Sequence, residues 1–415
     1  MVPNDWEQIR LNDVTEFITS GSRDWAQFYS DSGSKFVRMT NLSRDSIYLK
    51  LDDMKYVDVS SKSADGKRTS LSAGDVLMSI TAELGKIGWI PENFGEAYIN
   101  QHTALIRLND KRANSQYIAY LLSSKAMNHR INKLNDSGAK AGLNLPTIRS
   151  IHINLPPLPE QRKIAQILSI WDRGIATTEK LIDASKQQKK ALMQQLLTGK
   201  KRLIDPETGK AFEGDWEEAI LSNIAKVSIG LVTTMTKHYV ESGVPLIRNS
   251  DIKQNEIRKE KMIFLSESFA SENEHRKLKV NDVVTVHTGE VGVSAVIEGD
   301  MAGCLGFATL NSRPNLNKVL PTYLSWYFNS DRFINWCISM STGDGRQNLN
   351  LKDFVKAIVH LPELAEQQKI ASVLTAADKD IELLVAKLAH FKQEKKALMQ
   401  QLLTGKRRVK VNEVA

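Results

Sequence analysis

The stretch KKALMQQLLTGK occupies residues 189–200, and the same twelve residues return unchanged at 395–406. An internal identity of this length indicates a duplication. The similarity continues upstream, where LPPLPEQRKIAQIL at 155–168 aligns with LPELAEQQKIASVL at 361–374. Both matches have an offset of 206 residues, from 155 to 361 and from 189 to 395. The sequence therefore predicts two half-proteins in tandem, each ending in a nearly invariant segment.

Residues 155–200 and 361–406 are each predicted to form one long helix. Apolar residues recur in alternating steps of four and three, which is the pattern of a coiled-coil seam. Gly199 and Gly405 stand where a helix end favours glycine. A helix of about 40 residues is a rod of roughly 60 Å. The residues predicted to pack in the seam are Ile164, Leu168, Trp171, Ile175, Ile182, Leu192, Ile370, Leu374, Ile381, Leu384, Leu388, Phe391 and Leu398.

Each helix has one apolar stripe to bury, so its obvious partner is the other helix. A parallel pair would set Trp171 against the small Ala377, which is compensated in volume. An antiparallel pair needs no return connection along the rod, and short connections are the rule. We therefore expect an antiparallel coiled coil with an approximate two-fold axis. Lys189 and Lys395 interrupt the seam, and we expect each to pack its stem while its charge reaches water.

The other parts of the chain, residues 1–154 and 201–360, resemble each other only weakly, as in DWEQIRLNDV (5–14) and DWEEAILSNI (215–224). Both contain short runs typical of β-strands, such as DVLMSI and DVVTV, between turn residues, and each contains a helical stretch. The predicted fold class is α/β, with two α/β domains separated by the two helices in a pseudo-two-fold tandem repeat. Residues 407–415 are predicted to be a basic tail.

Composition narrows the class of protein. The net charge of +8 and pI near 9.2 favour a polyanionic partner. No apolar run approaches the roughly 18–20 residues that span a bilayer, and the first residues carry charges where a signal peptide is apolar. Cys304 and Cys337 offer neither a disulfide framework nor metal-ligand spacing. We expect both cysteines to be small core residues of a reduced, cytoplasmic protein.

The sequence contains no catalytic constellation. INLPPLPEQ has two adjacent prolines but lacks the Asn or Asp directly before them and the aromatic residue directly after them that an adenine methyltransferase motif has. LLTGKK and LLTGKR end helices, so they are not phosphate-binding loops. The histidines are scattered, without metal-ligand spacing. These observations favour a binding protein; a fused nuclease or methyltransferase, and a coiled-coil scaffold for protein partners, remain as alternatives.

Basic and polar residues at predicted turns are candidates for DNA contact, because Arg and Gln suit base edges and Lys suits phosphate. The alternative is that these loops are polar only because they face water. Arg38 and Arg248 recur at matching places, which favours a shared role as either a structural ion pair or a phosphate contact. For His287, a hydrogen-bonded structural role is the competing interpretation. The candidates are Arg23, Arg38, Asn41, Thr81, Lys86, Lys140, Arg248, His287, Thr288, Arg346 and Gln347.

The doubled pattern LP…EQ…KIA…LLTGK, together with GDVLMSITAELGKIG at 74–88, resembles the specificity subunits of type I restriction–modification systems. The resemblance covers essentially the whole chain. It implies that residues 1–154 and 201–360 are target-recognition domains, each binding one half of a split double-stranded DNA sequence. It also implies that 155–200 and 361–406 are the conserved helices that space the half-sites and dock methyltransferase subunits.

The same resemblance implies a subunit without catalysis or cofactors of its own. Two methyltransferase subunits would use S-adenosylmethionine to methylate adenine, and restriction subunits with motor and nuclease activity would use ATP. The complex would act in the cytoplasm, without a membrane, in DNA methylation and phage defence. The resemblance supplies no base code for the diverged loops, so the DNA sequence is not predicted.

Overall fold

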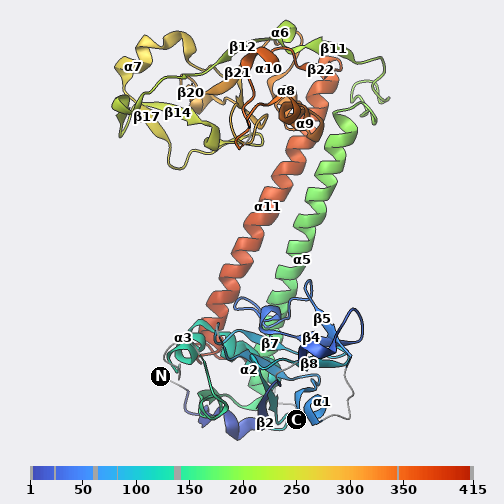
Figure 1. Ribbon diagram of the computed structural model, residues 1–415, viewed down its shortest axis with the longest axis vertical. Helices are drawn as coiled ribbons and strands as arrows, with labels where there is room; N and C mark the ends of the chain where they lie inside the picture. The colour runs from blue at the N-terminus through green and yellow to red at the C-terminus, as the bar shows by residue number, and fades with distance from the viewer. Residues whose placement is uncertain are drawn as a thin grey trace. The chain divides into compact units, whose positions relative to one another are not determined.

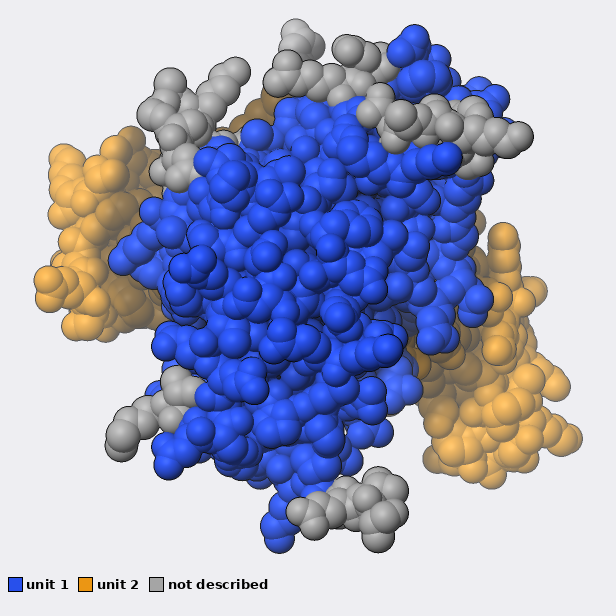
Figure 2. Space-filling model, turned by 90° about the horizontal axis from the view of Figure 1, so that it is seen from below, with its two compact units in different colours: residues 1–180, 386–415 blue, residues 181–385 orange. Residues whose placement is uncertain are grey.

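The computed structural model describes residues 3–22, 25–58, 64–81, 83–134, 142–343 and 345–411. The chain divides into two compact units, coloured separately in Figure 2. Unit 1 comprises residues 1–180 and 386–415, and unit 2 comprises residues 181–385. Both divisions fall inside long helices, α5 (Leu158–Leu196) and α11 (Leu364–Leu402). Each unit therefore contains one globular part together with a stretch of each helix.

Unit 1 contains two four-stranded sheets. The first is antiparallel, in the order β2 (Thr15–Ser20), β9 (Thr103–Leu108), β6 (Val76–Ser79) and β7 (Ile87–Trp89). The second is β3 (Tyr29–Ser30), β5 (Lys55–Val57), β4 (Ser34–Val37) and β8 (Ala97–Ile99), with β4 and β8 parallel. A ribbon pairs β1 (Glu7–Arg10) with β10 (His152–Leu155). The helices are α1 (Ala64–Thr69), α2 (Ser115–Ser123), α3 (Lys125–Lys133) and α4 (Leu145–Arg149).

Unit 2 repeats this topology. Its first sheet has the order β12 (Ala225–Ile229), β21 (Thr309–Pro314), β18 (Val283–Val286) and β19 (Ser294–Val296). Its second sheet has the order β13 (Tyr239–Val240), β17 (Ile263–Leu265), β14 (Val244–Arg248) and β20 (Leu305–Phe307) (Figure 1). Two ribbons pair β11 (Glu217–Ile220) with β22 (Ile358–Leu361) and β15 (Ile252–Lys253) with β16 (Glu256–Ile257). The helices are α6 (Leu221–Ile224), α7 (Glu267–Glu272), α8 (Pro321–Phe328), α9 (Asp331–Met340) and α10 (Leu351–Phe354). The duplication therefore extends through both α/β parts.

The repeated Glu-Gln pair of EQRKIA and EQQKIA attaches each long helix to its globular part. The Gln161 side chain accepts a hydrogen bond from the backbone N–H of Asn114 and donates to the Pro156 carbonyl, at 2.8 Å each. Gln367 makes the equivalent bonds to Leu320 and Pro362. Both glutamines are buried, so these bonds satisfy polar groups that water cannot reach. This requirement explains why the glutamine of the pair is retained in both copies.

The long helices run antiparallel where they meet in unit 1, which confirms the predicted orientation. Trp171 of α5 packs edge-on against Phe391 of α11, with ring centroids 5.6 Å apart and planes at 90°. Closer to the start of α5, Glu160 binds Arg408, which follows α11. As residue numbers rise along α5, from Glu160 to Trp171, the numbers of their partners fall, from Arg408 to Phe391. Trp171 meets a second aromatic ring and not the small Ala377 of the parallel alternative.

The seam is buried largely as expected. Ile164, Leu168, Ile182, Ile370, Leu374 and Ile381 are buried, and Trp171, Ile175, Leu192, Leu384, Leu388, Phe391 and Leu398 are partly buried. The expectation that the Lys395 charge reaches water is wrong, because this side chain is 8% exposed and its Nζ lies 2.6 Å from Asp172 Oδ1. Lys189 likewise binds Asp378 at 2.6 Å within unit 2. These acidic partners could not be predicted from the sequence, because they depend on the register of the two long helices.

Cys304 and Cys337 are buried free thiols, as predicted for core residues. Burial raises the pKa of each thiol to about 12, so both are protonated and unreactive at neutral pH. Among the residues that the structure describes, no helix is both long and apolar enough to cross a membrane.

Candidate nucleic-acid interface and docking grooves

Four predicted DNA-contact residues come together on one rim of unit 2. His287 and Thr288 directly follow β18, and Arg346 and Gln347 lie on the loop before α10. The Gly289 N–H donates to the Gln347 carbonyl at 3.0 Å, and the Leu349 N–H donates to the His287 carbonyl at 2.9 Å. The two loops are thus joined by backbone hydrogen bonds. We call this group of four residues the unit 2 rim.

Side-chain hydrogen bonds order the unit 2 rim. The Thr288 hydroxyl donates to Asn348 Oδ1 at 3.1 Å, and Thr288 Oγ1 lies 2.7 Å from His287 Nδ1. The His287 N–H donates to Asn249 Oδ1 at 2.8 Å. Burial lowers the pKa of His287 below its ordinary value, so the imidazole is neutral at neutral pH. Neither asparagine was among the predicted DNA contacts, although Asn348 directly follows the predicted pair Arg346 and Gln347.

The matching loops of unit 1 hold a related arrangement. Thr81 forms a β-bridge to Gly142, as Thr288 does to Asn348, and Thr81 Oγ1 lies 2.5 Å from His102 Nδ1. His102, which was not predicted, lies on the turn before β9. In unit 2, by contrast, the histidine is the residue next to the threonine. Its Nε2 lies 3.1 Å from the amide nitrogen of Gln101. The two units therefore share a threonine–histidine pair but build it from different loops.

The other candidates lie elsewhere or have partners within the chain. Lys86 forms a close ion pair with Glu83, which lowers the pKa of that carboxyl. Asn41 is buried, accepts from the Arg38 N–H and donates to the Lys50 carbonyl. Arg23 and Lys140 lie outside the described residues, so their placement stays a prediction.

Arg38 and Arg248 have the same local role in both units. Each precedes a 3-10 turn, η3 (Met39–Asn41) or η5 (Asn249–Asp251). Arg38 NH2 lies 2.8 Å from Asp53 Oδ2, and the guanidinium lowers the pKa of that carboxyl. Arg248 binds both carboxylate oxygens of Asp251, at 2.7 and 2.8 Å. Both arginines therefore make structural ion pairs, and phosphate contact by either one stays a prediction.

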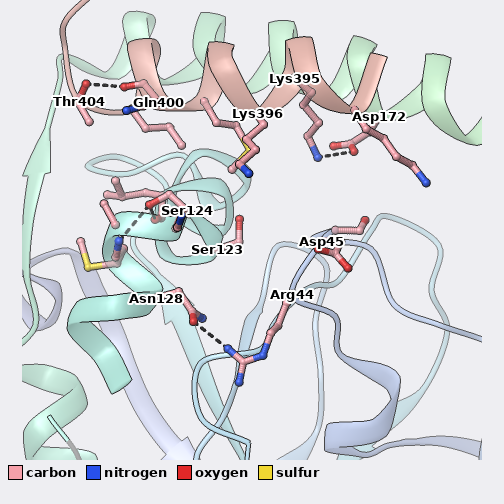
Figure 3. A pocket seen from close by; sticks show the side chains of 18 of the residues that line it. Arg44, Asp45, Ser123, Ser124, Asn128, Asp172, Lys395, Lys396, Gln400 and Thr404 are labelled. Atoms are coloured by element: carbon pink, nitrogen blue, oxygen red, sulfur yellow. Dashed lines mark hydrogen bonds and ion pairs between the residues drawn. The ribbon is translucent and has the colours of Figure 1, made fainter. Parts of the chain in front are cut away.

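Each unit also has a groove lined by its copy of the duplicated segment. The groove of unit 1 has a volume of about 1990 Å³ and lies beside the end of α11, opposite the corner between α2 and α3 (Figure 3). The groove of unit 2, about 410 Å³, lies between the end of α5 and the corner between α8 and α9. Their shared lining comes from equivalent positions: Lys395, Lys396, Met399, Gln400, Leu403, Thr404 and Lys406 in unit 1, and Lys189, Lys190, Met193, Gln194, Leu197, Thr198 and Lys200 in unit 2.

An ion pair lies in the wall of the unit 1 groove. Figure 3 shows Lys395 reaching Asp172, whose other oxygen accepts from the Tyr120 hydroxyl at 2.5 Å. Lys395 Nζ also lies 5.5 Å from the centre of the Tyr120 ring. In unit 2, Lys189 has the same relation to the Trp326 ring, at 5.5 Å. The first lysine of the duplicated segment thus has one role in both units, binding an acidic residue of the other helix beside an aromatic ring.

Comparison with known proteins identifies the family. The type I restriction modification DNA specificity domain matches this chain twice, over residues 3–187 and 213–393. The chain belongs to this family. It is a specificity subunit of the type I restriction–modification class, with two target-recognition domains and no catalytic role of its own.

Two relatives of this specificity subunit match along nearly its whole length, and a third matches over about 70% of it. The putative type I restriction enzyme MjaX specificity subunit of Methanocaldococcus jannaschii is 27% identical over 422 residues, covering 99% of this chain and 95% of the relative. The MjaVIII specificity subunit of the same organism is 24% identical over 433 residues, covering 99% and 94%. The EcoBI specificity subunit of Escherichia coli is 24% identical over 312 residues, covering 71% and 65%.

Solved structures show the same fold. The HsdS subunit from Thermoanaerobacter tengcongensis matches with a TM-score of 0.53 at 17% identity, covering 98% of each chain. The S subunit from M. genitalium matches with a TM-score of 0.59 at 12% identity, covering 97% of each chain. The predicted α/β fold with two long helices is therefore confirmed.

Proposed function

We propose that each unit of this specificity subunit binds one half of a bipartite double-stranded DNA site. The proposal rests on one observation, which is that the two units share a topology but carry different hydrogen-bonding side chains at the matching loops. Both units place a threonine–histidine pair on the same sheet topology, but unit 2 builds it from Thr288 and the adjacent His287, and unit 1 builds it from Thr81 and the distant His102. A common frame with different hydrogen-bonding groups is what two readers of different base sequences need. The net charge of +8 favours the phosphate backbone.

The test is methylation of defined DNA by the subunit together with a methyltransferase partner. A single split sequence should be methylated, and affinity should fall steeply with salt because phosphate contacts release counterions. Methylation without sequence preference would refute the proposal. A salt-independent interaction would instead favour the scaffold alternative, and cutting or methylation by the isolated chain would favour an enzyme.

We further propose that the two grooves dock two methyltransferase subunits. Both grooves have an apolar floor, with Met399 and Leu403 in unit 1 and Met193 and Leu197 in unit 2. Exposed lysines, Lys396 and Lys406 or Lys190 and Lys200, stand beside these floors. Identical partners require identical surfaces, whereas domains that read different bases do not. This difference accounts for the unchanged twelve-residue segment beside diverged domains.

Charge reversal tests this docking. Lys396→Glu should reduce the number of bound methyltransferase subunits from two to one, and Lys190→Glu should do the same. The double variant should bind none. Light scattering of the purified complex measures the stoichiometry, and two bound subunits in the double variant would contradict the proposal.

Helices α5 and α11 have 39 residues each, and a helix of that length is about 58 Å long. We propose that this length sets the gap between half-sites. One DNA turn is about 34–36 Å, so half-sites about one turn apart lie within reach of a helix of this length. S-adenosylmethionine and ATP would be bound by the methyltransferase and restriction subunits, and the complex would act in the cytoplasm.

A further inference from the structure

The unit 2 rim fixes the position of one proton. Asn348 Oδ1 can only accept, so the single proton of the Thr288 hydroxyl is directed to it, at 3.1 Å. Thr288 Oγ1 then has lone pairs for His287 Nδ1, 2.7 Å away. In this geometry, Nδ1 of His287 carries the proton. A neutral imidazole with its proton on Nδ1 has an unprotonated Nε2, which is a hydrogen-bond acceptor.

No hydrogen bond engages His287 Nε2 among the residues described, and the atom is not among the buried unpaired polar atoms of that same part of the chain. The side chain is partly exposed at the end of β18. In unit 1 the corresponding acceptor, His102 Nε2, already lies 3.1 Å from the Gln101 amide nitrogen. Unit 2 alone of the two pairs therefore presents a free imidazole acceptor.

Base edges differ in what they offer to such an acceptor. In the major groove, adenine N6 and cytosine N4 are amino donors, whereas guanine O6 and N7 and thymine O4 are acceptors. An unprotonated Nε2 can bind the first two and is repelled by the others. Arg346, whose guanidinium approaches the neighbouring Gly289, has the opposite preference because it only donates.

We propose that His287 is a specificity-determining residue that accepts a hydrogen bond from the exocyclic amino group of adenine or cytosine in the half-site bound by unit 2. Thr288 and Asn348 are positioning residues that hold the imidazole in the required tautomer. This inference rests on the proposed DNA-binding function and adds the chemical group that is read.

The experiment measures binding of the full chain with its methyltransferase partner to duplexes in which single amino groups are removed. Purine replaces adenine and pyrimidin-2-one replaces cytosine, one position at a time, in both half-sites. For the wild-type protein, removal at one position should weaken binding about tenfold or more. His287→Leu should abolish that difference at that position and leave the other half-site unaffected. The adenine and cytosine arms identify which base carries the amino group.

Two further variants make the test specific. Thr288→Val frees the tautomer and should reduce the discrimination, whereas Asn348→Asp keeps an acceptor for the Thr288 hydroxyl and should retain it. His275→Leu replaces an exposed histidine of unit 2 outside the rim and serves as the matched control. Thermal unfolding of each variant establishes that it is folded.

The possible failures are distinguishable. A wild-type complex without preference for any split sequence would refute the proposed function, and this inference with it. A wild-type complex that prefers one sequence, but whose amino-group dependence is unchanged by His287→Leu and by Thr288→Val, would overturn the assignment of His287 alone.

Discussion

The ion pair between Lys395 and Asp172 gives a quantitative prediction. Both side chains are 8% exposed, and their charged atoms are 2.6 Å apart. Lys395→Met keeps an apolar stem in the seam but leaves the Asp172 carboxylate buried, with the Tyr120 hydroxyl as its remaining side-chain donor. Breaking a buried pair in this way costs about 3–5 kcal/mol, because one charge loses its counter-charge without regaining water.

The equivalent pair in unit 2 provides a matched comparison. Lys189 and Asp378 have the same separation of 2.6 Å, but their side chains are 14% and 27% exposed. Water can therefore solvate Asp378 after Lys189→Met, and the expected cost is about 1–2 kcal/mol. The double variant Asp172→Asn with Lys395→Met removes both charges of the unit 1 pair and keeps an acceptor for Tyr120. It should recover most of the stability lost in the single variant.

Urea unfolding followed by pulsed hydrogen exchange measures each unit separately, through peptides from α2 for unit 1 and α8 for unit 2. With a urea dependence of about 3 kcal/mol per molar, Lys395→Met should lower the unit 1 midpoint by about 1–1.7 M. Lys189→Met should lower the unit 2 midpoint by less than about 0.7 M. Equal shifts in the two units, or a double variant as unstable as Lys395→Met, would refute the reasoning.

Three further predictions concern the helices, the chain ends and the loops. Inserting seven residues after Thr178 and after Leu384 should lengthen each helix by about 10 Å and widen the preferred DNA gap by about 3 base pairs, as measured by methylation of spacer variants; an unchanged gap would show that the helices do not set it. Arg408→Ala removes a guanidinium that binds Asp5 and the buried Glu160. A loss of about 1–2 kcal/mol should lower the melting temperature of unit 1 by about 2–8 °C. Arg202→Ala, which removes the equivalent bond to Glu366, should instead destabilise unit 2, and an effect on the opposite unit would contradict this assignment. Arg346→Ala should change discrimination in one half-site, whereas Arg38→Ala should weaken binding to all sequences and break the ion pair with the exposed Asp53. Binding assays that find equal effects would contradict the distinction.

Part of this architecture could be predicted from residue patterns alone. The spacing of Ile164, Leu168 and their successors specifies a helix with one apolar stripe, because side chains three and four residues apart lie on one face. The repeated Glu160-Gln161 and Glu366-Gln367 pairs indicated a requirement shared by both halves. They did not reveal its cause, which is the hydrogen bonds of the glutamines and the arginine ion pairs of the glutamates. The loop residues were harder to predict, since Arg38 and Arg248 have the composition of DNA contacts and also of ion pairs.

The sequence by itself determined the duplication, the two long helices and the separation into constant and diverged parts, since these depend on order along the chain. Only the tertiary structure decided that Lys395 meets Asp172, that Arg408 of the predicted tail binds Glu160, and that Thr81 finds its histidine at position 102 while Thr288 finds its own next to it. These contacts join residues far apart in the chain, or depend on how neighbouring loops close. The electrostatic and hydrogen-bond energies behind them fall off within a few ångströms, so they are set by helix orientation and register, which composition does not encode.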